Sequence, residues 1–340
     1  MIIDCSQAID VDTLTPKTSF EIEVIDFLKD WFSGASTVKV KTSGSTGTPK
    51  IFDIEKERMR HSAKMTCDFL NLNSGDTAFL CLPVEYISGK MMVVRALEKG
   101  LKLRVATPST RPLENLKQAI DFCAMTPLQV EQSLDKIHYI KKLIIGGAAV
   151  SESLVRKLQK LNLKDTTIYE TYGMSETLSH IALKSIIPER KLFFEVLNEV
   201  KISTDNRGCL QIDAPYLNEN RLVTNDMVEL NGTNQFRFLG RVDHIINSGG
   251  AKIFPEQLEA MAKQYISQEV VFTSLPDRLL GERLIAVVEG KESLKLKTIF
   301  EHLPYEKKLL QPKTIMFISE IPRTPNGKVD RLALKTRISN

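Results

Sequence analysis

Residues 37–50 read Thr-Val-Lys-Val-Lys-Thr-Ser-Gly-Ser-Thr-Gly-Thr-Pro-Lys, an alternating strand followed by a loop rich in glycine and hydroxyl groups. Glycine lets a backbone approach an anion closely, and hydroxyl and N–H groups can surround the anion's oxygens. The pattern differs from a Walker loop, because Pro49 precedes Lys50 and Ile51 follows it. A flexible linker is the alternative, but linkers rarely lie directly between a strand and a helix. The candidate phosphate-binding residues are Thr42, Ser43, Gly44, Ser45, Thr46, Gly47 and Lys50.

Strand-like and helical segments alternate on both sides of this loop. Helical spacing of apolar residues is found at 19–33, 55–70, 89–99 and 151–161, and strand-like runs at 77–82, 101–106, 142–146 and 166–170. Strands that alternate with helices predict a parallel sheet covered by helices. Ser19 is expected to cap the first of these helices.

The pattern changes near residue 191. Short β-like runs follow one another at 192–202, 209–213, 221–230 and 235–240, which predicts a small antiparallel appendage. A helix is expected at 255–264, and the last ~90 residues alternate strand and helix. The prediction is therefore an α/β protein with a large domain at 1–242, built of sheets flanked by helices, and a small α+β domain at 243–340.

The composition excludes several classes of protein. Lysine and arginine number 46 against 42 acidic residues, so the net charge of +4 is too small for a typical nucleic-acid binder. Five scattered cysteines and five scattered histidines predict neither a disulfide framework nor a structural zinc site. No signal peptide and no membrane span are expected, which favours a cytoplasmic protein.

A second motif follows the strand-like run at 166–170, where open sheets bind ligands. Residues 169–177 read Tyr-Glu-Thr-Tyr-Gly-Met-Ser-Glu-Thr. Tyr172 can stack on a base, and the Glu176 carboxylate is a suitable ligand for Mg²⁺. The alternative is an ordinary turn in which Ser175 caps a helix.

Two further segments carry candidate binding groups. Asp226 can accept hydrogen bonds from both ribose hydroxyls, and Arg241 can share the ribose or a phosphate. A Pro/Gly-rich loop at 322–329 presents one lysine, Lys328. Taken singly, each of these is more typical of a surface turn than of a site.

Together, the segments resemble the adenylate-forming superfamily of acyl-CoA synthetases, peptide-synthetase adenylation domains and luciferases. TSGSTGTPK resembles its phosphate loop, and TYGMSET resembles its YGxTE motif with Ser175 in place of threonine. TND resembles its TGD, with Asn225 in place of glycine. GRVDHIINSGGAKIFPEQLE at 240–259 and PRTPNGKVDR at 322–331 are similar to its hinge motif and its C-terminal lysine loop.

This resemblance implies ATP, Mg²⁺ and coenzyme A as partners in a two-step reaction. Lys328 and Glu176 would be catalytic, with Glu176 also the metal ligand. Tyr172, Gly173, Ser175, Asp226 and Arg241 would join the phosphate loop in binding ATP. The small domain would be mobile, with a hinge near Asp243, and Gly249 and Gly250 would line the coenzyme A tunnel.

The segments 82–97 and 143–150 most resemble short o-succinylbenzoate–CoA ligases of menaquinone biosynthesis. The acyl pocket would then contain Tyr86, Ser88, Arg95, Gly147 and Ala148. Since that substrate carries a second carboxylate, Arg95 is the candidate cation. The alternative for Arg95 is an exposed helix position paired with Glu98.

Other functions are left open at this point. The acid could be a different aryl, acyl or amino acid, with a carrier protein as acceptor, or the chain could be a non-catalytic nucleotide-binding relative. A scaffold role fits least well. Only 41 residues precede the loop, whereas members of the superfamily have a long N-terminal subdomain there. A homodimer that covers the exposed flank is therefore expected.

Overall fold

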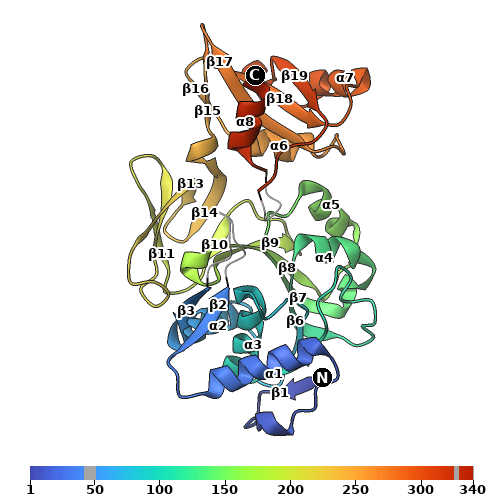
Figure 1. The fold of residues 1–340 in the computed structure, drawn as a ribbon, viewed down its shortest axis with the longest axis vertical. Helices are drawn as coiled ribbons and strands as arrows, with labels where there is room; N and C mark the ends of the chain where they lie inside the picture. The colour runs from blue at the N-terminus through green and yellow to red at the C-terminus, as the bar shows by residue number, and fades with distance from the viewer. Residues whose placement is uncertain (42–50, 325–328, 340) are drawn as a thin grey trace.

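The computed structural model describes residues 1–41, 51–324 and 329–339. Within them, one large sheet and the helices around it form the body of the molecule, and a smaller sheet with its own helices lies at one end (Figure 1). Helix α1 (Ser19–Phe32) and the N-terminus lie at the opposite end (Figure 1). This mixed α/β architecture confirms the predicted fold class.

The large sheet has a parallel centre and antiparallel flanks. Five neighbouring strands at its centre, formed by residues within 77–173, pair in parallel, and the flanking pairs are antiparallel. In spatial order its strands are β1 (Ile2–Asp4), β5 (Lys102–Val105), β4 (Thr77–Leu80), β6 (Ile120–Met125), β7 (Ile140–Ile145), β8 (Thr167–Gly173), β9 (His180–Ile187), β10 (Phe194–Val196), β14 (Gln235–Arg241), β13 (Leu222–Asn231), β12 (Cys209–Asp213) and β11 (Lys201–Thr204).

Helices cover both faces of the parallel centre. They are α1 (Ser19–Phe32), α2 (Lys56–Phe69), α3 (Ile87–Lys99), α4 (Pro127–Gln132) and α5 (Glu152–Lys160). Successive strand residues point to opposite faces, so Leu80 packs in the core with α1–α3 while Phe79 packs in the core with α5. This two-sided burial explains why the central strands read as continuous apolar runs.

Helix α1 forms as its sequence predicts, with Phe20, Val24, Phe27 and Trp31 buried on one face. The predicted cap at Ser19 is wrong. The hydroxyl of Thr18 instead accepts a hydrogen bond from the backbone N–H of Glu21, because Thr18 has the extended backbone of a cap and Ser19 is already helical.

The sequence suggested that the loop at 42–50 leads from a strand into a helix, and this expectation is wrong. Strand β3 (Ile51–Glu55) follows it and pairs antiparallel with β2 (Thr37–Lys41). Helix α2 begins only at Lys56. The strand was missed although Ile51, Phe52 and Ile54 are apolar, because it is only five residues long and runs directly into helix α2.

The predicted β appendage is part of the large sheet. Strand β9 pairs with β8, and β10 and β14 continue the sheet to β13, β12 and β11. The run expected at 192–202 forms two separate strands, β10 and β11. The change from parallel to antiparallel pairing at β8–β9 produced the change in sequence pattern, but backbone pairing continues across it.

The smaller sheet contains residues from Ile246 onward. Its strands are β16 (Ala251–Ile253), β15 (Ile246–Ser248), β18 (Gly281–Glu289), β17 (Val270–Asp277) and β19 (Thr314–Ile318), with helices α6 (Pro255–Ala262), α7 (Leu294–His302) and α8 (Arg331–Ser339). Short 3-10 turns lie at Val11–Thr13, Leu134–Tyr139, Ser175–Thr177, Val242–His244 and Lys308–Leu310. The expected boundary near Asp243 falls between the two sheets.

Candidate active site

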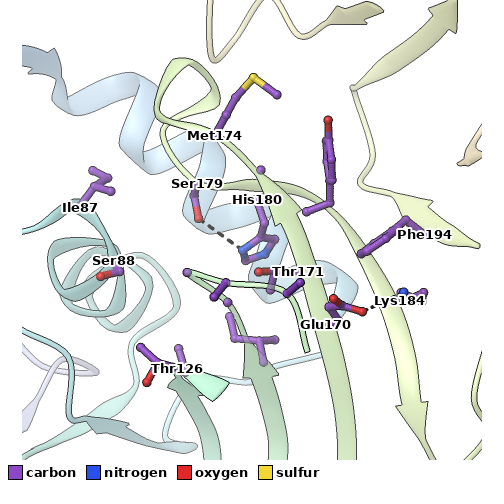
Figure 2. A pocket seen from close by; sticks show the side chains of 18 of the residues that line it. Ile87, Ser88, Thr126, Glu170, Thr171, Met174, Ser179, His180, Lys184 and Phe194 are labelled. Carbon is purple, nitrogen blue, oxygen red and sulfur yellow. Dashed lines mark hydrogen bonds and ion pairs between the residues drawn. The ribbon is translucent and has the colours of Figure 1, made fainter. Parts of the chain in front are cut away.

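A cavity of about 630 Å³ lies where the central strands of the large sheet end. It is lined by residues that follow β6 and β7, by β8 and the turn after it, and by side chains of α3, β9 and β13. Figure 2 shows Ser88 of α3, Thr126 after β6, Ser179 of the β8–β9 connection and His180 at the start of β9 around this space. Open α/β sheets bind ligands at this edge, so the cavity is the candidate active site.

Tyr172 and Asp226 meet at one end of this cavity. The Tyr172 hydroxyl donates a hydrogen bond of 2.6 Å to Oδ2 of Asp226, and both residues line the cavity. The ring of Tyr172 packs edge-on against Phe236 at 4.9 Å between centroids. Burial, and then the Asp226 carboxylate, raise the pKa of the Tyr172 hydroxyl, so it stays a donor to that carboxylate.

Arg241 lies opposite Asp226 in the β13–β14 register. Its Nη1 is 3.4 Å from Oδ1 of Asp226, and its Nη2 donates at 2.9 Å to Oδ2 of Asp243. Burial works against the charge of this guanidinium, but the two carboxylates outweigh it and raise the pKa of Arg241. The β13–β14 pair places Asp226 beside Arg241, and the Tyr172 side chain reaches this pair from β8, so the three residues form one polar cluster.

The turn after β8 is shaped by Gly173. A Cβ on this residue would lie 2.4 Å from the backbone oxygen of Ser179, so only glycine allows the chain to pass this close to β9. Ser175 is exposed and lines the cavity. It is not the cap of the following 3-10 turn, a position that Met174 occupies.

Glu176 lies on the same turn but is exposed and does not line the cavity. Its backbone oxygen accepts a hydrogen bond from the side-chain amide of Asn218 at 3.1 Å. In the described part of the chain, its carboxylate has no hydrogen-bond or ion-pair partner. Carboxylate oxygen is the ligand type that Mg²⁺ prefers, and this one is available for a cation.

Arg95 is buried in the cavity wall rather than exposed on its helix. Its side chain is 2% exposed, and its Nη2 donates at 2.7 Å to the hydroxyl of Ser179. The pairing with Glu98 considered from the sequence is wrong, because Glu98 lies on the exposed face of α3. Burial lowers the pKa of Arg95 to about 10, and its Nε has no partner among the described residues.

The other acyl-pocket candidates divide into two groups. Ser88, Gly147 and Ala148 line the cavity, and Ser88 lies seven residues before Arg95 on the same face of α3. Tyr86 precedes the first turn of α3 and does not line the cavity.

Three candidates lie beyond the cavity wall. Asp243 is in the short turn between the two sheets, where its carboxylate binds Arg241 and Asn225. Gly249 and Gly250 form the two-residue loop between β15 and β16, with φ of 57° and 81°. Positive φ at both positions is what a tight hairpin turn of this type requires, which gives these glycines a structural role.

The phosphate-loop candidates and Lys328 lie outside the described residues. These are Thr42, Ser43, Gly44, Ser45, Thr46, Gly47 and Lys50, together with Lys328. Their roles therefore stay predictions. The strands that flank the loop, β2 and β3, are described, and Lys41 at the end of β2 forms an ion pair with Glu85 just before α3.

Comparisons with known proteins agree with this geometry. The family described as AMP-binding enzyme matches residues 41–201. An AMP-forming acyl-CoA synthetase/AMP-acid ligase II-like protein from Dyadobacter fermentans has 32% sequence identity and a TM-score of 0.67, over 97% of both chains. The chain belongs to the AMP-binding enzyme family. The expected superfamily and its enzymatic class, ATP-dependent activation of an acid, are thereby confirmed.

Two more relatives of this AMP-binding enzyme have the same acid, succinylbenzoate, in their names. The 2-succinylbenzoate–CoA ligase of Listeria monocytogenes is 25% identical over 92% of this chain and 73% of its own length. The o-succinylbenzoate coenzyme A synthetase of Bacillus subtilis, solved with ATP and magnesium, has a TM-score of 0.72 at 18% identity. That likeness covers 89% of this chain and 69% of the other, and it concerns the fold alone.

Sequence reasoning missed several residues of this AMP-binding enzyme's cavity. Lys184 of β9 is 2.8 Å from a carboxylate oxygen of Glu170 on β8 and lies 4.4 Å from the centroid of the Phe194 ring (Figure 2). Ser179 and His180 also line the cavity. Ser179 and His180 could have been suspected from the sequence, because they follow the candidate residue Glu176 by only three and four residues and β9 begins at His180.

Neither a metal cluster nor a membrane helix is found in the described part of the enzyme. At 1–41, 51–324 and 329–339, no three His, Cys, Asp or Glu residues are grouped to hold a metal ion. Across the same residues, no helix has the length and apolar character needed to span a bilayer.

Proposed function

We propose that the protein joins o-succinylbenzoate to coenzyme A in two steps, with an acyl-adenylate as intermediate. The observation that carries the choice of acid is Arg95, a buried cation in the cavity wall whose Nε has no partner among the described residues. A buried charge is costly unless an opposite charge reaches it, and a second carboxylate on the substrate would do so. The curated relatives named 2-succinylbenzoate–CoA ligase support the same acid.

In the first step, a carboxylate oxygen of the acid attacks the α-phosphorus of ATP, and pyrophosphate leaves. The Asp226 carboxylate would accept hydrogen bonds from the ribose hydroxyls, and its contacts with Arg241 and Tyr172 support this role. The loop at 42–50 and Lys328 would surround the phosphates, where donors stabilise the charge that develops on the oxygens.

Mg²⁺ fits this site through the carboxylate of Glu176, which is exposed on the turn after β8. When bound, the ion would offset the repulsion between the attacking carboxylate and the triphosphate. The donor is a hard oxygen without a competing side-chain partner in the described residues, which suits this cation.

In the second step, the thiol of coenzyme A attacks the acyl carbon, and AMP leaves. The small domain, residues 243–340, would rotate about Asp243 between the steps, removing Lys328 and bringing Gly249 and Gly250 towards the thiol. The five cysteines are all free, which suits the reducing cytoplasm where ATP and coenzyme A are found.

A pyrophosphate-release screen across aryl and aliphatic acids tests this function. We expect o-succinylbenzoate to give the highest kcat/KM, and mass spectrometry to detect its coenzyme A thioester. Preference for another acid would overturn the substrate assignment. An acyl group found only on a carrier protein would overturn the acceptor, and nucleotide binding without pyrophosphate release would indicate a non-catalytic relative.

A further inference from the structure

A row of hydrogen bonds leads from helix α2 to the buried Arg95. The hydroxyl of Thr66 lies 3.0 Å from Nε2 of His180, and Nδ1 of His180 lies 3.3 Å from the hydroxyl of Ser179. That hydroxyl accepts the 2.7 Å hydrogen bond from Arg95. Figure 2 shows the contact between Ser179 and His180 at the cavity.

Thr66 and Arg95, at the two ends of this row, decide which group donates and which accepts in each hydrogen bond. With the Thr66 proton donated to the backbone oxygen of Ser62 at 3.1 Å, as is usual for a threonine within a helix, its hydroxyl oxygen accepts from His180. His180 then carries its proton on Nε2 and accepts at Nδ1. Ser179 donates to Nδ1, which leaves its oxygen lone pairs directed to Arg95.

This arrangement requires a neutral imidazole. Burial, and then the charge of Arg95, hold the pKa of His180 well below its usual value. An imidazolium would donate from both nitrogens, and Ser179 could no longer donate to it. The row therefore fixes Ser179 as an acceptor beside Arg95 without bringing a second charge to the cavity.

The row leaves Arg95 without a neutralising charge. Ser179 offers one neutral acceptor, His180 is held neutral, and the thiol of Cys67 on α2 is the group that acts to raise the pKa of the guanidinium. In the described residues, Arg95 forms no ion pair with a carboxylate. A protein that needed only a buried structural arginine would gain from pairing it.

We propose that Ser179, His180 and Thr66 are positioning residues that aim Arg95 at the second carboxylate of the acid. The proposal rests on the proposed function and adds the residues that set its selectivity for dicarboxylic acids. Because the row ends at Arg95 and forms no hydrogen bond to Tyr172, Asp226 or Arg241, it should act on binding of the acid and not on ATP. None of them is a catalytic residue.

Steady-state adenylation assays test this with o-succinylbenzoate and with a monocarboxylic aryl acid such as benzoate. A hydrogen bond to a charged group changes binding roughly tenfold or more, so Ser179→Ala should raise KM for the dicarboxylic acid by about that factor. Thr66→Val, which removes a hydrogen bond to the neutral His180, should raise this KM in the same direction but by less. KM for ATP and for benzoate should stay within about twofold. Ser179→Thr, which keeps the hydroxyl, should restore KM.

Ser62→Ala is the matched control, because the buried Ser62 hydroxyl one turn before Thr66 has no partner in the described part of the chain. It should leave every KM unchanged. In an Arg95→Ala background, Ser179→Ala should have no further effect on KM. Thermal unfolding measurements show whether each variant is folded. If Ser179→Ala does not fold, Ser179→Cys takes its place in the comparison.

The outcomes separate this proposal from the proposed function. If wild type releases no pyrophosphate with any acid, the proposed function falls and the positioning role falls with it. If o-succinylbenzoate is activated but Ser179→Ala raises KM for both acids equally, or for neither, only the positioning role is overturned.

Discussion

The side-chain amide of Asn225 donates to both carboxylate oxygens of Asp243, at 3.2 Å each. The side-chain oxygen of Asn225 in turn accepts from Arg207 at 3.1 Å. Burial works against the charge of Asp243, but the bonds from Arg241 and Asn225 outweigh it and lower the Asp243 pKa. The large sheet therefore holds the proposed hinge residue from two sides.

Asp243→Pro should spare adenylation and slow thioester formation at least about tenfold, since proline fixes φ near −65° and a hinge must change it. Asp243→Ala is the matched control, because it removes the same side chain but leaves φ free. Single-turnover assays of each half-reaction measure both variants. Thioester formation at the wild-type rate in Asp243→Pro would contradict rotation at this residue.

Lys328→Ala should abolish adenylation while transfer from a preformed acyl-adenylate to coenzyme A continues. Loss of one positioned charge contact at a developing anion costs about 3 kcal/mol or more, on the order of 10²–10³ in rate. Lys291→Ala, at an exposed position of the same domain, is the control. Equal loss in both half-reactions would show that Lys328 does not act in the first step alone.

Arg95→Ala should raise KM for o-succinylbenzoate roughly 10- to 100-fold and leave KM for ATP nearly unchanged, because a hydrogen-bonded charge contact is lost on the acid alone. Arg111→Ala serves as the control, since Arg111 is exposed and paired with Asp135 away from the cavity. An equal rise in KM for both substrates would assign Arg95 a purely structural role.

Lowering the pH should destabilise the protein through His180. Its folded pKa is depressed by burial and by Arg95, so below about pH 6.5 the unfolded chain binds a proton that the folded chain excludes. Each pH unit below this value should remove up to about 1.4 kcal/mol from the free energy of unfolding, as long as the folded His180 stays neutral. Urea unfolding of wild type and His180→Gln measures this, and identical pH dependence would contradict it.

A homodimer in solution stays a prediction. Helix α1 buries its inner face, but Ile22 and Phe32 on its outer side are 50% and 52% exposed. A two-fold partner is the commonest way to cover such side chains. Light scattering at micromolar concentration should give about twice the 38.3 kDa of one chain, and a mass near 38.3 kDa would contradict the dimer.

Much of the fold could be predicted because its signals are local. The apolar spacing of residues 19–33 and 55–70 predicted α1 and α2, and the apolar runs at 77–82 and 142–146 predicted β4 and β7. Helical and strand periodicities repeat within a few residues, so a single window contains the information. Strand β3 was missed because it depends on pairing with β2, and the true cap of α1 was missed because it depends on the extended backbone angles of Thr18.

The sequence by itself determined the family, the order of the motifs, and the placing of Tyr172 and Asp226 in one site. Only the tertiary structure decided that Arg95 is buried and that Ser179, 84 residues later, accepts its hydrogen bond. The same holds for His180 and Thr66, which are separated by 114 residues. Such pairs leave no periodic trace in the sequence, because the sheet and the helices packed on it bring them together only after folding.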